Sequence, residues 1–355
     1  MRILLAAPTF GVYGGIEVFV MTLADWLRRA TAYEIRVCFK VVGGCKVVPA
    51  LDDQCRRLDL KYRFVRRGSS GLLRDIHWAD LVHSNTCSPD FALLSKLAGR
   101  PLVLTVHNWF RGMRGLRNRV WYLCNRLADW RTYNSQFVLR TWEPGGPYPG
   151  SDLIPTVSVL PQRETALRDR RGFFFISRLI ENKGVDVLVK AYARARIDRG
   201  RWPLTIAGDG PMGPWARDYI ARNRVAGIDI VGFLSEDEKA RRMAGAMWLV
   251  APPNTQEDMG LTPIEARNVG VPAIVTRDGG LPEAAGPAAL VCAPGGVMEL
   301  AGLLERAASM PPSEYQERAA LARESLRTYL RPLSDYVAIY ERVTAGRGLT
   351  AGRGA

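Results

Sequence analysis

Short apolar runs alternate with longer amphipathic segments twice along this chain of 355 residues. Residues 2–8 form an apolar run of strand length, and residues 16–30 have the periodicity of an amphipathic helix. Alternating strands and helices predict parallel sheets flanked by helices. At about 150 residues per domain, the length accommodates two such units. The sequence therefore predicts an α/β fold with two βα domains.

A segment rich in proline, glycine and charge, residues 143–171, interrupts this alternation and is the predicted linker region. The pattern restarts with a strand-like run at residues 172–179 and an amphipathic segment at 183–196. Two further helices are predicted at residues 313–330 and 334–346, separated by a proline. The last dozen residues repeat a glycine-rich unit, which predicts a flexible tail.

Composition excludes several classes of protein. No apolar stretch reaches the 18 or so residues of a spanning helix, and the first apolar run stops at Pro8, so we expect neither a transmembrane segment nor a signal peptide. The six cysteines contain no Cys-x-x-Cys pair, and with three histidines they form no zinc-type spacing. This cysteine usage predicts a cytoplasmic protein.

The net charge of +14 is concentrated in the first half of the chain. Residues 1–160 contain 22 Lys and Arg against 12 Asp and Glu, whereas the remainder contains 27 against 23. Residues 111–140 contain seven arginines and one acid, interleaved with Trp and Leu. Such a segment predicts contact with an anionic membrane or with the pyrophosphate of a lipid-linked acceptor, or else a solvated helix face. Its candidate contact residues are Arg111, Arg114, Arg117, Arg119 and Trp121.

Glycines and cations follow predicted strands in both halves. Gly14 and Gly15 lie between the first strand and its helix, where glycine allows either a ligand near the backbone or simply a tight turn. Arg178 and Lys183 follow the first strand of the second half, a position at which α/β proteins hold phosphate. Two solvated surface cations are the alternative interpretation.

The most informative run extends from Glu257 to Glu265 and follows another predicted strand. Gly260 and Leu261 could present backbone N–H groups to a diphosphate at a helix N-terminus, while the two carboxylates accept hydrogen bonds from hydroxyls. The structural alternative is a capping box, with Thr262 as the N-cap residue and Glu265 three positions later.

With these motifs the sequence resembles the retaining glycosyltransferases of the GT-B fold, family 4 (glycosyl transferases group 1). The resemblance rests on Glu-x7-Glu (257–265), the Gly-Gly pair (14–15) and Arg-Leu-x-x-x-Lys-Gly (178–184). It also rests on Ala-Gly-Asp-Gly-Pro (207–211), Val-Gly-Phe (231–233) and Gly-Gly-Leu-Pro-Glu (279–283). It implies two Rossmann-like domains facing a central cleft, with C-terminal helices returning to the N-terminal domain. The predicted domains are residues 1–165, which bind the acceptor, and 166–330, which bind the donor, followed by a returning helix at 331–344 and the tail at 345–355.

The resemblance also implies roles for individual residues. Glu265 would hold the donor ribose and Glu257 the transferred sugar, while Arg178 and Lys183 neutralise the diphosphate. His107, at the end of a predicted strand, matches the family's histidine near the sugar. The implied catalytic residues are His107, Glu257, Arg178 and Lys183. The implied donor-binding residues are Gly14, Gly15, Arg178, Lys183, Gly232, Phe233, Glu257, Met259, Gly260, Leu261 and Glu265.

The chain contains no Asp-x-Asp, so we expect catalysis with neither a metal nor another cofactor, the leaving diphosphate being neutralised by Arg178, Lys183 and helix N-termini. The expected activity is retaining transfer of a hexosyl group from a UDP- or GDP-sugar to a lipid-linked saccharide in bacterial surface or exopolysaccharide synthesis. We expect the enzyme to work in the cytoplasm, in peripheral contact with the inner face of the membrane. Alternatives are glycosylation of a small natural product, a nucleotide-sugar epimerase or phosphorylase of the same fold, and a basic nucleic-acid-binding protein. Nucleic-acid binding would explain the positive charge, but it would not explain the motifs that follow the predicted strands.

Overall fold

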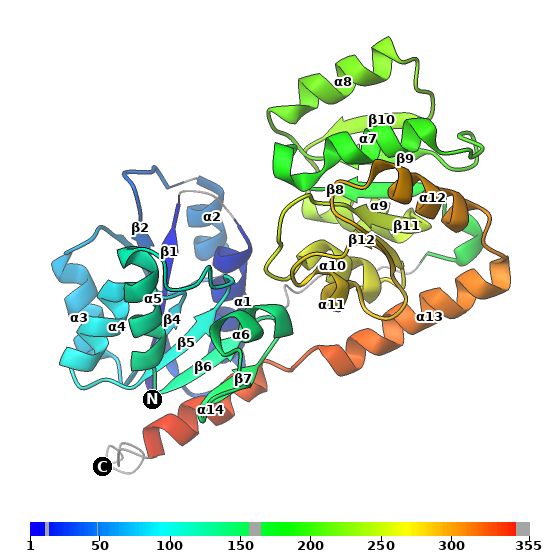
Figure 1. The fold of residues 1–355 in the computed structure, drawn as a ribbon. Helices are drawn as coiled ribbons and strands as arrows, with labels where there is room; N and C mark the ends of the chain where they lie inside the picture. Colours follow the sequence, from blue (N-terminus) through cyan, green and yellow to red (C-terminus); the bar gives the residue numbers. More distant parts are fainter. Residues whose placement is uncertain (11–13, 48, 156–164, 346–355) are drawn as a thin grey trace. The chain divides into compact units, whose positions relative to one another are not determined.

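The protein is described by a computed structural model that covers residues 1–10, 14–47, 49–155 and 165–345. The chain divides into two compact units (Figure 1), one formed by Met1–Ser158 with Leu330–Ala355 and the other by Val159–Tyr329. Part of the predicted linker and residues 346–355 of the predicted tail lie outside the described residues. The α/β class with two Rossmann-like units is confirmed.

The first unit contains a parallel sheet in the order β3-β2-β1-β4-β5-β6-β7. Its strands are β1 (Arg2–Thr9), β2 (Glu34–Val41), β3 (Tyr62–Val65), β4 (Leu81–Asn85), β5 (Leu102–Val106), β6 (Trp130–Tyr133) and β7 (Ser151–Leu153). Its helices are α1 (Gly15–Ala30), α2 (Pro49–Arg57), α3 (Ser70–Trp78), α4 (Pro89–Leu97), α5 (Leu116–Leu127), α6 (Gln136–Trp142) and α14 (Ser334–Ala345).

The second unit contains a parallel sheet in the order β10-β9-β8-β11-β12-β13. Its strands are β8 (Phe173–Ile176), β9 (Leu204–Ala207), β10 (Ile228–Gly232), β11 (Trp248–Ala251), β12 (Ala273–Thr276) and β13 (Leu290–Cys292). Its helices are η1 (Leu167–Asp169), η2 (Glu181–Lys183), α7 (Val185–Arg194), α8 (Met212–Arg222), α9 (Glu236–Gly245), α10 (Leu261–Asn268), α11 (Leu281–Ala285), α12 (Val297–Ala308) and α13 (Pro312–Tyr329).

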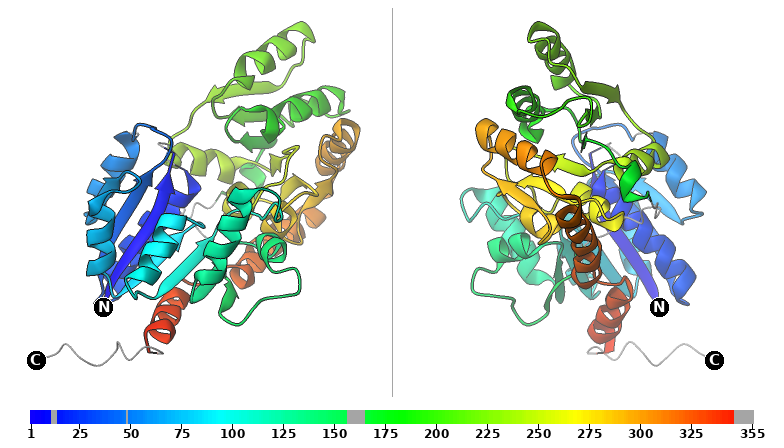
Figure 2. Two further views of the ribbon diagram at one scale, coloured as in Figure 1. Left: turned by 60° about the vertical axis from the view of Figure 1, so that its left-hand side comes forward. Right: turned by 90° about the vertical axis from the view of Figure 1, so that its right-hand side faces the viewer.

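Helices cover both faces of each sheet (Figure 2), and the alternation of side chains along each central strand builds a core on both faces. In β1, Ile3 and Leu5 join the core that includes α1 and α14, whereas Leu4 packs on the opposite face with α3 and α4. In β8, Phe173 and Phe174 likewise belong to different cores. Strands that are buried on both faces read as continuous apolar runs, and this explains why the sequence pattern located them.

Of the two C-terminal helices, α13 belongs to the second unit and α14 to the first. The helix α14 packs on the first sheet through Tyr336 and Tyr340, which are both fully buried. Tyr340 donates or accepts a hydrogen bond at His83 Nδ1 over 2.8 Å, and His83 Nε2 lies 2.7 Å from Thr105 Oγ1. Hydrogen bonds through His83 of β4 and Thr105 of β5 thus hold α14 on the first sheet.

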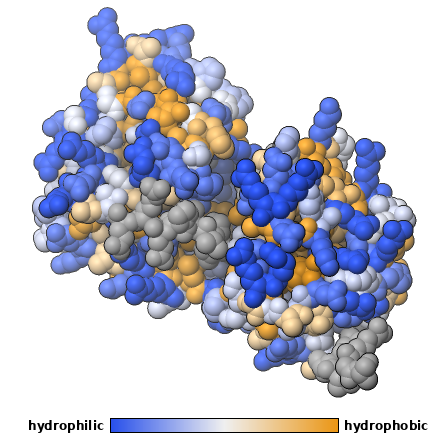
Figure 3. Space-filling view, turned by 180° about the vertical axis from the view of Figure 1, so that it is seen from behind, coloured by the Kyte–Doolittle hydropathy of each residue, from blue (hydrophilic) through white to orange (hydrophobic). Residues whose placement is uncertain are grey.

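The surface carries many hydrophilic side chains. On the face shown in Figure 3 they surround smaller hydrophobic patches. None of the helices in the described part of the chain is both long and apolar enough to span a membrane. The cysteines at positions 38, 45, 55, 87, 124 and 292 are all free thiols.

Candidate functional site

The second sheet reverses its strand order between β8 and β11, and polar residues gather where these two strands end. Lys183 follows β8 in the short helix η2, and Glu257 lies in the loop after β11. Their side chains form an ion pair, and each is about one-fifth exposed, at 21% and 22%. Ligands of open α/β sheets bind outside such a switch point. The structure therefore brings together two residues that the sequence analysis selected separately.

Glycines allow the loops of this site to pack closely. Gly184, with φ of 72°, approaches the carbonyl of Pro252 so closely that a Cβ atom would overlap with it. Gly279 approaches the carbonyl oxygen of Glu257 in the same way, and the Gly280 N–H donates to this oxygen over 2.8 Å. These glycines hold the loop that carries Glu257 against the turn after β12.

The capping box predicted at Thr262 is wrong. The helix α10 begins at Leu261, and its N-cap residue is Gly260, which has φ of 97° and offers no side chain to cap the helix. Because glycine reaches this backbone conformation without strain, the helix starts two residues earlier than predicted. Glu265 is therefore released from a capping role, and the first turn of the helix keeps N–H groups that no side-chain cap occupies.

Glu265 is buried, with 5% of its surface exposed, and its partner is Lys239 of α9. Lys239 Nζ lies 3.2 Å from Glu265 Oε1 and 2.6 Å from Glu236 Oε2. Among the described residues, the buried Oε2 atom of Glu265 has no hydrogen-bond partner. Burial raises the pKa of Glu265, although the lysine partly offsets this effect. An unpartnered buried carboxylate oxygen can accept a hydrogen bond from a ligand hydroxyl.

The sequence analysis missed Lys239. A lysine in the helix after Val-Gly-Phe (231–233) was the one signal that could have pointed to it. Its partner, Glu265, is 26 positions further along the chain. Only the packing of α9 against α10, the helix that carries Glu265, could assign the pair.

The ends of β8, β9 and β10 form a second cluster of candidate residues. Leu179 N–H donates to the Asp209 carbonyl over 2.8 Å, and Gly208 N–H donates to the Gly232 carbonyl over 2.7 Å. Arg178 lies exposed at this edge and makes no ion pair within the described residues. Phe233 is 81% exposed. The predicted residues at this edge are thus accessible to a ligand.

The predicted residue Met259 differs from its neighbours, because its side chain is buried, with 4% exposed. Leu261 is half-buried.

In the first unit, the strand order reverses between β1 and β4. Gly14 is the N-cap residue of α1 and Gly15 its first residue, and the cap has no side-chain hydrogen bond. His107 follows β5 and is 7% exposed, with Nε2 lying 3.3 Å from Asn85 Oδ1. Burial lowers the pKa of His107 to about 4, so the imidazole is neutral at neutral pH. Asn85, which the sequence analysis did not select, orients this ring.

The basic segment 111–140 divides into several elements rather than one helix face. Arg111, Arg114, Arg117 and Arg119 are exposed, and Arg117 lies over the ring of half-buried Trp121 at 5.1 Å. Leu116 is 79% exposed and Leu123 is 53% exposed.

Arg131 departs from the surface interpretation, because it is buried and donates to the carbonyls of Asn125, Ala128 and Pro149. Its contacts are those of a structural residue within the first unit.

No group of three or more His, Cys, Asp or Glu side chains that could hold a metal ion occurs among the residues with described positions.

Two parallel sheets with polar residues at their switch points define a two-domain α/β protein of the GT-B class, and known proteins agree with this class. The model for Glycosyltransferase Family 4 matches residues 13–154, and that for Glycosyl transferases group 1 matches residues 160–325. The chain belongs to this glycosyltransferase family, as the motifs predicted.

Curated relatives match part of the chain. Glycogen synthase of Mycobacterium tuberculosis is 34% identical over 167 residues, covering 45% of this chain and 40% of that protein. A GDP-mannose-dependent monoacylated alpha-(1-6)-phosphatidylinositol monomannoside mannosyltransferase of Corynebacterium glutamicum is 29% identical over 182 residues, covering 45% of this chain and 48% of that protein. The chain thus spans less than half the length of these two relatives.

The fold is similar to that of Anabaena HepE, which was solved in complex with UDP-glucose. The TM-score is 0.76 at 18% sequence identity, covering 98% of this chain and 99% of HepE. A likeness at this level of identity concerns the fold.

Proposed function

We propose that this protein transfers a hexosyl group from a nucleotide sugar, UDP- or GDP-linked, to an acceptor with retention of anomeric configuration. The observation that carries the proposal is the arrangement at the second switch point, where Lys183 pairs with Glu257 and the buried Glu265 keeps an unpartnered oxygen. A diphosphate-linked sugar requires cations near its phosphate groups and hydrogen-bond acceptors near its hydroxyl groups.

In this proposal Arg178 and Lys183 stabilise the negative charge that develops on the diphosphate as the bond to the sugar breaks. The backbone N–H groups of Gly260 and Leu261, at the N-terminus of α10, add to this stabilisation of negative charge. Lys183 has three N–H donors, so it can hold Glu257 and a phosphate oxygen together. We expect no metal and no other cofactor to take part.

Hydroxyl groups would be recognised by the carboxylates, the sugar by Glu257 and the ribose by the free oxygen of Glu265. Phe233 offers an exposed ring beside which a base could stack. His107 is assigned to the sugar by the family resemblance. Its low pKa makes it a neutral hydrogen-bonding group rather than a cation.

For the acceptor we propose a lipid-linked saccharide of bacterial surface or exopolysaccharide synthesis, handled by a cytoplasmic enzyme at the inner face of the membrane. The exposed arginines and leucines of the segment 111–123 support this choice. The Corynebacterium relative, named for a phosphatidylinositol mannoside acceptor, also supports it. A small natural product is the alternative acceptor.

The test is a screen of UDP- and GDP-sugars for binding, slow hydrolysis without acceptor, and transfer to added polyprenyl-linked saccharides. We expect Arg178→Ala and Lys183→Ala each to lower turnover on the order of a hundredfold or more, with unchanged folding. Arg222→Ala, which removes an exposed arginine of α8, is the matched control. Near-normal turnover in both variants would refute the site.

Product formation from a nucleotide sugar alone, with the sugar isomerised and still attached, would instead indicate an epimerase.

A further inference from the structure

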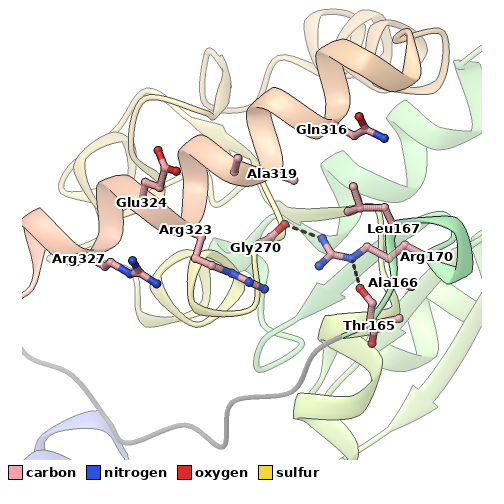
Figure 4. Close-up of a pocket in the computed structure, with 11 residues that line it drawn as sticks. Thr165, Ala166, Leu167, Arg170, Gly270, Gln316, Ala319, Arg323, Glu324 and Arg327 are labelled. Carbon is pink, nitrogen blue, oxygen red and sulfur yellow. Dashed lines mark hydrogen bonds between the residues drawn. The ribbon is translucent and has the colours of Figure 1, made fainter.

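A cavity of about 580 Å³ lies in the second unit, apart from the candidate donor site. It is lined by one face of α13, by the segment around η1 and by Gly270, the residue two positions beyond α10 (Figure 4). Thr165 and Arg170 precede β8, and Gly270 precedes β12, so the cavity opens at the amino ends of these strands. The donor residues follow the carboxyl ends of the same sheet. The cavity has the volume of an ordinary small-molecule site.

Arg170 lies at the cavity with only 6% of its surface exposed. Its guanidinium donates to the carbonyls of Gly270 at 2.6 Å, Val269 at 2.8 Å and Thr165 at 3.4 Å. These carbonyls satisfy hydrogen bonds but do not neutralise the charge. Within the described residues Arg170 makes no ion pair with a carboxylate, so its positive charge is buried without a counter-ion, which is costly in a protein interior.

Two more arginines add positive charge to the same cavity. Arg323 and Arg327 are four positions apart on α13 and therefore share one face of the helix. In Figure 4 the guanidinium groups of Arg323 and Arg170 approach Gly270 from two different elements. Glu324 is the one acidic side chain among the described residues that line the cavity. The buried Arg170 and the exposed Arg327 by themselves outnumber this carboxylate, and a surplus of positive charge favours an anion.

We propose that this cavity binds a small phosphate ester. Guanidinium groups match the geometry of phosphate oxygens, and the field of a buried, unpaired Arg170 strengthens the attraction. The hydroxyl of Thr165 and the amide of Gln316 supply hydrogen bonds for the organic part of the ligand. This site does not depend on the proposed transferase activity.

The test is calorimetric titration of the full chain with inorganic phosphate and with glycerol 3-phosphate, at ionic strength held constant with chloride. Glycerol serves as the uncharged probe. Three proteins are compared with wild type. The first lacks cavity charges (Arg323→Ala with Arg327→Ala), the second lacks donor-site charges (Arg178→Ala with Lys183→Ala), and the third lacks exposed arginines elsewhere in the unit (Arg217→Ala with Arg306→Ala).

We expect the affinity for glycerol 3-phosphate to fall about tenfold or more in the cavity variant and to be retained in the other two. Glycerol should give no heat of binding. Arg327 is exposed, so the single variant Arg327→Ala repeats the test without disturbing packing if the double variant folds poorly. Equal affinity in the wild type and cavity variants, or loss of binding only in the donor-site variant, would overturn the proposal, as would an absence of binding to the wild type.

Discussion

Glu265 illustrates how one residue's role depends on its neighbours. Its position three residues after Thr262 suggests a capping box at the start of a helix. In the structure it instead pairs with Lys239 of another helix. Burial favours the protonated carboxyl, and the lysine favours the ionised one. Lys239 thereby favours the ionised state, in which the free oxygen of Glu265 accepts hydrogen bonds.

We predict that Lys239→Met weakens nucleotide-sugar binding on the order of tenfold, because an unpaired buried carboxylate takes up a proton. Binding needs ionised Glu265, so it is present above the pKa of this group and is lost as the pH falls through it. Without the lysine this loss moves to higher pH. Titration of a donor across pH 5–8 measures both effects. Glu236→Gln, which leaves the 3.2 Å contact intact, is the control, and an unchanged profile in Lys239→Met would contradict the assignment.

The buried histidines predict how stability depends on pH. Burial lowers the pKa of His83 to about 3 and that of His107 to about 4, whereas in an unfolded chain both protonate below about pH 6.5. The stability that the two neutral, buried histidines contribute is therefore complete above pH 6.5, and it is lost as the pH falls towards 4. We expect each buried histidine to lower the free energy of unfolding by about 2 kcal/mol when the pH is lowered from 7 to 5.

Urea unfolding at these two pH values tests this prediction. The variants His83→Gln and His107→Gln should each flatten the decline, and His77→Gln controls for loss of an exposed histidine. If the free energy of unfolding declines as steeply in both buried-site variants as in the wild type, groups other than these histidines cause the decline.

At the scale of elements, turns built on glycine bring strand ends together. The loop after β11 carries Glu257, and the turn after β12 carries Gly279 at φ of 60°. Because the two backbones nearly touch, the loop cannot keep its position if a side chain appears at this glycine.

We predict that Gly279→Ala lowers kcat/KM on the order of tenfold or more and destabilises the second unit by about 1–3 kcal/mol, since both strain and overlap act at one position. The matched control is Gly302→Ala inside α12, where a Cβ would meet open space and helix propensity should raise stability. Thermal unfolding and steady-state kinetics measure the two effects. Full activity in Gly279→Ala would mean that the Glu257 loop does not form the site.

At the scale of the whole molecule, the charge of +14 acts mainly through the first unit. Arg111, Arg114, Arg117 and Arg119 are exposed beside Leu116 and Leu123, a combination typical of surfaces that contact anionic lipids.

We predict that the protein binds anionic vesicles and that replacing these four arginines with alanine weakens binding on the order of a hundredfold or more, at about 1 kcal/mol for each basic residue near the surface. Cosedimentation with phosphatidylcholine vesicles, with or without phosphatidylserine, measures the effect. The charge-matched control replaces Arg201, Arg217, Arg222 and Arg306, all exposed in the second unit. Equal binding to neutral and anionic vesicles would contradict the prediction.

Local sequence determined the class of fold and much of the donor site. Strands buried on both faces must be apolar, and the glycines and charges that follow them are adjacent in the chain, so Lys183, Glu257 and the turn at Gly260 were predictable. Packing between distant segments decided the rest. The start of α10 at Leu261, the pairing of Glu265 with Lys239, the burial of Arg131 and the cavity at Arg170 each depend on contacts between separate elements. No local pattern specifies such contacts, because they form only when the sheet brings those elements together.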